Sequence, residues 1–128
     1  MRFCHINAAS AKKHKDEIFN RFGKMDIISI NETNLHDKLQ FQFPGFNIFR
    51  FDRSQKKGGG VLLAVRKEIQ CHKVFSEDFD NNECVAIQIF TKNGPLLICS
   101  IYIPPQAKIS TRETSTNKIF RIQIMCKT

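Results

Sequence analysis

Short apolar segments rich in β-branched residues recur along the chain, and they limit the fold to one built mainly from strands. The clearest are residues 26–31, 61–66, 83–90 and 96–103, whose length and composition are typical of buried strands. None approaches the roughly 20 apolar residues that a membrane span needs. A strand, a helix, a second strand and then a series of strands predict an α/β or α+β fold with a mixed or antiparallel sheet.

One helix is expected between the first two strands, at residues 2–7 and 26–31. His14, Ile18 and Phe22 recur there at helical spacing. Ser10 suits the N-cap, because its hydroxyl can accept a hydrogen bond from the first turn. Gly23 is expected to end the helix in the left-handed conformation.

Two turns are predicted among the later strands. Residues 92–95, Lys-Asn-Gly-Pro, favour a hairpin because Asn and Gly tolerate positive φ. The glycines at 58–60 precede a strand, with no Lys-Ser/Thr and no helix after them. They therefore indicate a turn or bulge rather than a phosphate-binding loop.

The chain has 128 residues, which is one domain at most, and a net charge of +8. Residues 1–105 and residues 106–128 each contribute a net +4. Such a balance favours an anionic partner such as nucleic acid, with a merely soluble basic surface as the alternative. Five scattered cysteines without a CxxC pair, and no apolar leader, predict reduced thiols in an intracellular protein of the nucleus or cytoplasm.

Three polar residues sit where strands end. Glu32 directly follows the run at 26–31. Open α/β sheets gather ligand-binding groups just past the carboxyl ends of their strands, and Mg²⁺ can bind through a single carboxylate. The alternative is a solvated carboxylate in a turn. Asn7 and Tyr102 end other strand-like runs and can contact a phosphate. Their alternatives are a turn asparagine bonding its own backbone and a half-buried strand tyrosine.

The order of the motifs is more specific than any one of them. They are Asn7-x-x-Ser10, Asn31-Glu32-Thr33 after a buried strand, Arg50-Phe51-Asp52-Arg53, Gly58-Gly59-Gly60-Val61 and Ile101-Tyr102-Ile103-Pro104-Pro105. Over residues 1–105 this set resembles the endonuclease/exonuclease/phosphatase superfamily. Within it, the set looks like the apurinic-type endonuclease domain of non-LTR (LINE-like) retrotransposons.

The resemblance implies a four-layer α/β sandwich and a metal-dependent DNA endonuclease without a membrane partner. It implies that Asn7, Glu32 and Tyr102 are catalytic, with Glu32 binding Mg²⁺, or Mn²⁺ in its place. It further implies that Arg53 contacts the DNA backbone. It leaves the oligomeric state unspecified.

The chain also departs from the family. The family's later Gly-Asp-Phe-Asn and Ser-Asp-His motifs are absent, no Asp follows Asp80, and neither Glu83 nor Glu113 has a matching context. We therefore expect residues 1–105 to be the N-terminal half of the domain and residues 106–128 a divergent basic tail. Such a chain is expected to be nearly inactive alone, and one sheet is expected to lack its partner and expose an apolar face. A non-catalytic, basic fragment that binds nucleic acid and a phosphatase of the same superfamily are the alternatives.

Overall fold

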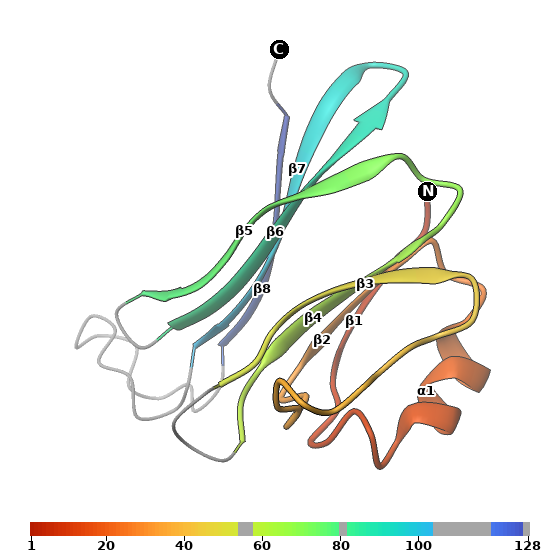
Figure 1. Ribbon diagram of the computed structural model, residues 1–128. Helices are drawn as coiled ribbons and strands as arrows, with labels where there is room; N and C mark the ends of the chain where they lie inside the picture. The colour runs from red at the N-terminus through yellow and green to blue at the C-terminus, as the bar shows by residue number, and fades with distance from the viewer. Residues whose placement is uncertain (54–57, 80–81, 104–118, 127–128) are drawn as a thin grey trace.

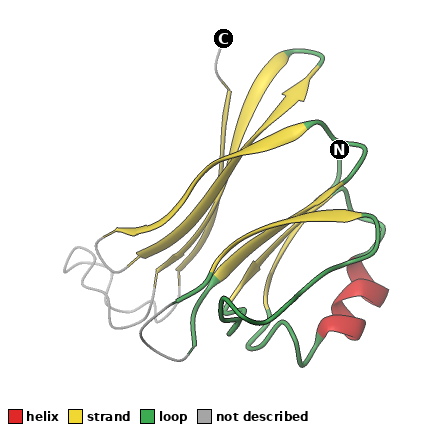
Figure 2. Cartoon of the chain, in the orientation of Figure 1, coloured by secondary structure: helices red, strands yellow, loops and turns green. Residues whose placement is uncertain are grey.

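The computed structural model describes residues 1–53, 58–79, 82–103 and 119–126, and for residues 77–79 and 119–126 the backbone alone. In this part of the chain, two four-stranded sheets face each other and a helix covers the outer side of the first (Figures 1 and 2). The elements are β1 (Phe3–Asn7), α1 (Lys15–Phe22), β2 (Ile27–Asn31), β3 (Phe46–Phe51), β4 (Val61–Arg66), β5 (Cys71–Phe79), β6 (Asn82–Thr91), β7 (Gly94–Ile103) and β8 (Ile119–Cys126). This arrangement confirms the predicted mixed α/β class.

Strand β2 is buried along its whole length because the first sheet, ordered β1-β2-β4-β3, surrounds it. It pairs in parallel with β1 and antiparallel with β4. Ile28 and Ile30 face the helix side, whereas Ile27 faces the second sheet. Coverage on both faces explains why this segment is a continuous apolar run rather than an alternating one.

Helix α1 forms where the apolar spacing predicts it and ends at Gly23 as predicted, but its start and the conformation of Gly23 differ from the prediction. Ile18 is buried against the first sheet. His14, not Ser10, is the N-cap, because the Ser10 hydroxyl accepts from the backbone of Lys13 in a separate turn before the helix. Gly23 is right-handed at φ −65°, and its N–H continues the helical pattern by donating to a carbonyl within the helix.

The second sheet is antiparallel throughout, in the order β5-β6-β7-β8. The hairpin predicted at residues 92–95 joins β6 to β7 and is confirmed, with Gly94 at φ +113°. Strand β5 was not expected, because its sequence lacks a regular alternation. The strand has a register shift between Lys73 and Phe75, which leaves Val74 47% exposed. This bulge interrupts the alternation of apolar and polar residues that would have indicated a strand.

The expectation that one sheet would lack its partner is wrong for the described residues. Strands β1 to β4 form the first sheet, and strands β5 to β8 form the second. The facing sides of the two sheets enclose one apolar core. The buried members of that core are Ile27, Val61, Leu63, Val65, Val85, Ile87, Ile89, Ile98 and Tyr102. The inner faces are therefore covered by each other, which removes them from water.

Part of the segment expected to be a divergent tail joins the second sheet, and it does so where the alternation of Phe120, Ile122 and Ile124 predicts a strand over residues 118–125. Strand β8 pairs with β7 from Ile119 opposite Ile103 to Cys126 opposite Leu96. The rest of that segment, and Pro104-Pro105, lie outside the described residues. Within the described part of the chain, no helix is long and apolar enough to cross a bilayer.

Candidate functional site

The ends of β1 and β2 lie side by side because the two strands are parallel. Asn7 is the register partner of Asn31, and Glu32 follows at the same edge of the sheet. The Asn7 amide oxygen accepts from the backbone N–H of Ala9 at 3.1 Å, so this residue does form a turn with its own backbone. Glu32 has φ +53°, a left-handed value that is uncommon outside glycine. The parallel register thus brings two of the three predicted residues to one edge.

Tyr102 reaches the same edge from the second sheet. Its hydroxyl donates to Glu32 Oε1 at 2.8 Å, across 70 positions in the sequence. The Tyr102 side chain is buried, and burial is the main cause that raises the pKa of its phenol. The hydrogen bond to Glu32 and the negative charge of that carboxylate raise the phenol pKa further. Tyr102 is therefore a protonated donor at neutral pH.

A chain of polar side chains beneath this contact joins the two sheets. Ser29 Oγ lies 2.9 Å from His5 Nδ1 and 2.7 Å from Ser100 Oγ. The Ser100 hydroxyl donates to Asn31 Oδ1 at 3.3 Å, and the Asn31 amide donates to the carbonyl of Ile101 at 3.4 Å. Burial lowers the pKa of His5. These contacts fix the strand ends that carry the site, because β2 and β7 meet at directional bonds rather than at apolar contacts alone.

Arg53 and Glu83 form a second pair near the first. The Arg53 guanidinium donates to Glu83 Oε1 through Nε at 2.8 Å and through Nη2 at 2.6 Å. Glu83 is 3% exposed, and its Oε2 accepts from the backbone N–H of Gly60 at 2.5 Å. Glu83 lies opposite Tyr102 in the β6–β7 register, so the two pairs are neighbours. Sequence reasoning missed Glu83, although a carboxylate opening the apolar run at 83–90 was a signal for it.

The donor groups at this edge fit a hard cation. Among the described residues, no three or more His, Cys, Asp or Glu side chains gather as a metal-binding group. Mg²⁺ needs fewer, since it keeps several waters and takes one or two carboxylates together with phosphate oxygens. Glu32 supplies a carboxylate, and the Asn7 amide and Tyr102 phenol supply groups suited to phosphate oxygens. The arrangement can hold a cation and a phosphate together.

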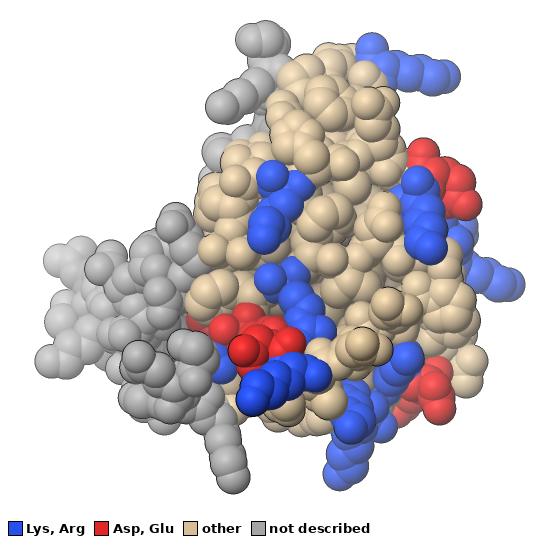
Figure 3. Space-filling model, viewed as in Figure 1, with Lys and Arg blue, Asp and Glu red and all other residues tan. Residues whose placement is uncertain are grey.

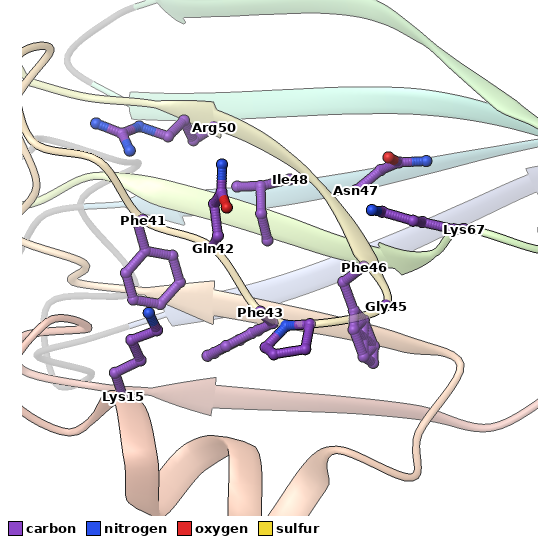
Figure 4. A pocket seen from close by; sticks show the side chains of 11 residues that line it. Lys15, Phe41, Gln42, Phe43, Gly45, Phe46, Asn47, Ile48, Arg50 and Lys67 are labelled. Atoms are coloured by element: carbon purple, nitrogen blue, oxygen red, sulfur yellow. The ribbon is translucent and has the colours of Figure 1, made fainter.

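A hollow of about 550 Å³ lies elsewhere, on the outer side of the first sheet (Figure 4). Its walls include Phe41, Phe43 and Phe46, and the Lys15 amino group lies 5.8 Å from the centre of the Phe41 ring. The sequence-predicted site residues do not line it. This hollow is therefore separate from the candidate site.

Basic and acidic side chains are interspersed on the face that Figure 3 shows. In Figure 3, Lys and Arg side chains lie across the visible face between acidic ones and do not gather into a single stripe. The net charge of +8 belongs to the whole sequence. On this face, the basic side chains therefore mark no single track.

Comparison with known proteins gives a weak similarity. No protein-family model matches the chain. Over 92 residues, or 71% of its length, the chain is 22% identical to the RNA-directed DNA polymerase from mobile element jockey of Drosophila funebris. The matched segment spans 10% of that much longer protein. The similarity supports a LINE-like origin for the chain.

Proposed function

We propose that the chain is the N-terminal half of a Mg²⁺-dependent DNA endonuclease from a LINE-like retroelement. The observation that carries the proposal is the 2.8 Å hydrogen bond between Glu32 and Tyr102, which joins two motif residues from different sheets at one edge. Asn7 lies at the same edge through the parallel pairing of β1 and β2. The LINE-like origin supports the same reading.

Each residue has a role in this proposal. Glu32 holds the cation, which when bound neutralises charge on the scissile phosphate. The Tyr102 phenol stays protonated, and its one proton turns from Glu32 to a phosphate oxygen when the cation and DNA bind. The Asn7 amide orients that phosphate, and Arg53, held by Glu83, faces the DNA backbone.

The chain alone is proposed to bind but not to cleave. Hydrolysis also needs an activated water, and a general base that activates it raises the rate by about 10²–10⁴-fold. The sequence has no Asp after Asp80 and no Ser-Asp-His motif that could supply it. Coupled catalytic groups lose activity together when one is missing, so Glu32 and Tyr102 cannot compensate.

Nicking of supercoiled DNA tests the proposal. A restored full-length protein, with the missing motifs following residues 1–105, should nick the plasmid in Mg²⁺ and not in EDTA. Glu32→Ala should abolish nicking, and the 128-residue chain should not nick. Equal nicking by the restored protein and its Glu32→Ala variant would refute the role of Glu32. Release of phosphate from small phosphomonoesters without nicking would favour the phosphatase branch.

A second function follows from charge alone. The net charge of +8 favours a non-catalytic fragment that binds nucleic acid through counterion release. Its affinity should fall steeply as salt rises, and Glu32→Ala, which removes a negative charge, should not lower it. An affinity that is insensitive to salt would contradict it.

A further inference from the structure

Glu83 is a buried carboxylate that the proposed function does not use directly. It lies at the start of β6 with 3% exposure, and its two oxygens contact different partners. Oε1 accepts from the Arg53 guanidinium, and Oε2 accepts from the backbone N–H of Gly60. A buried charge needs such partners, and here one of them is the backbone of a loop.

That loop in turn holds the segment around Glu32. The carbonyl of Gly60 accepts from the Thr33 N–H at 3.4 Å, and the carbonyl of Gly59 accepts from the Asn34 N–H at 2.8 Å. The Thr33 hydroxyl also points to the Gly59 carbonyl, at 3.5 Å. The two residues that follow Glu32 are therefore fixed to the glycine turn.

The backbone at Glu32 needs this support. Glu32 and Asn34 have φ of +53° and +54°, which costs free energy for residues with a Cβ and persists only where surrounding contacts impose it. Gly59 in the turn has φ +66° and packs against the Arg53 and Glu83 side chains. A Cβ on Gly59 would lie 2.3 Å from Arg53 Nη2 and 2.6 Å from Glu83 Oε1.

We infer that Glu83 is a positioning residue for Glu32, acting through the Gly59–Gly60 turn. The contacts run from the Glu83 carboxylate to the Gly60 N–H, and from the glycine carbonyls to Thr33 and Asn34. Glu83 also faces Tyr102 across the β6–β7 register, so one carboxylate fixes the turn beside both partners of the Glu32–Tyr102 contact. The inference rests on the proposed function insofar as it assigns Glu32 a cation to bind.

Amide hydrogen exchange tests the positioning without any metal. In Glu83→Ala, the protection of the Asn34 and Thr33 amides should fall about tenfold, the factor expected from losing one net hydrogen bond. Core amides of β4 should keep their protection. Glu83→Gln retains an oxygen for the Gly60 N–H and should restore much of the protection. Glu17→Gln, at an exposed carboxylate of α1, is the charge-matched control and should change nothing.

A second variant guards against a failure of Glu83→Ala to fold. Gly59→Ala keeps Glu83 but places a Cβ 2.6 Å from Glu83 Oε1 at a backbone φ of +66°, so it displaces the Glu83 carboxylate and strains the turn, and it should reduce protection at the same two amides. Wild-type protection of Asn34 in a folded Glu83→Ala or Gly59→Ala variant would overturn the inference. An even loss at all amides, including those of β4, would also overturn it, because Glu83 would then serve general stability.

Metal binding separates this inference from the proposed function. With Mn²⁺ as the probe, measured by electron paramagnetic resonance, Glu83→Ala should bind about 10–100-fold more weakly than the wild type, as outer residues of metal sites do. Equal Mn²⁺ affinity in the two proteins would overturn the positioning role while leaving the proposed site intact. No Mn²⁺ binding by the wild type would contradict the proposed function, and the exchange data would still decide the positioning.

Discussion

Replacing Tyr102 by Phe removes one hydroxyl from the contact that joins the two sheets at the candidate site. The aromatic ring stays in the inter-sheet core, so no large cavity forms. The lost interaction is a 2.8 Å hydrogen bond to a carboxylate. Such bonds contribute about 1.5–3 kcal/mol, and the lower end applies because Glu32 is only partly buried. Tyr102→Phe should therefore lower the free energy of unfolding by about 1.5 kcal/mol.

Urea and thermal unfolding followed by circular dichroism measure this loss. With an unfolding entropy of about 2.1 cal/mol/K per residue, the same loss lowers the melting temperature of a 128-residue chain by about 6 °C. A double-mutant cycle with Glu32→Ala isolates the pair, and Tyr102→Phe should cost clearly less once Glu32 is gone. A change below about 0.5 kcal/mol, with additive single substitutions, would refute the assigned contact.

Three further predictions concern the interior of the sandwich. Burial lowers the pKa of His5 below its ordinary 6.5, so the folded protein disfavours the proton. The stabilising contribution of neutral His5 is then fully present above about pH 6.5 and is lost as the pH falls toward the lowered pKa. In urea unfolding, the free energy of unfolding should fall less on acidification in His5→Asn than in the wild type. Equal decreases in the two proteins would contradict this prediction. Ser100→Ala leaves Asn31 Oδ1 and Ser29 Oγ without a shared hydroxyl and should cost about 1–3 kcal/mol, whereas a neutral result would show that the polar chain does not couple the sheets. Leu63→Ala in the inter-sheet core should cost about 2–5 kcal/mol by urea unfolding, and a cost like that of a surface residue would argue against the facing sheets.

The strands were predictable where composition alone decides them. Residues 61–66 form β4 with the predicted bounds because a run of Val, Leu and Ala buried on both faces has few alternatives. Strand β5 was not predictable, since its bulge at Val74 breaks the period-two pattern. The start of α1 was also missed, although its end at Gly23 was predicted. Ser10 has the chemistry of a cap, but an extra turn places His14 at the start of the helix.

The candidate site was predictable only in part. The position of Glu32 after a buried strand follows from the sequence, and its grouping with Asn7 and Tyr102 came from the resemblance. Glu83 was set aside because it has no matching context in the family motifs, and its partners, Arg53 and the Gly60 backbone, are far away in the sequence. Burial of a charged side chain depends on such long-range pairing, which a single sequence does not display.

Terbium luminescence tests the central claim, that Glu32 binds a hard cation beside Tyr102, most directly. The chain has one tyrosine and no tryptophan, so light absorbed by tyrosine can sensitise a bound Tb³⁺ ion only near Tyr102. The account predicts sensitised luminescence from the wild-type chain, its displacement by Mg²⁺, and its loss in Glu32→Gln. Equal luminescence from a folded Glu32→Gln variant, or none from the folded wild type, would contradict the claim.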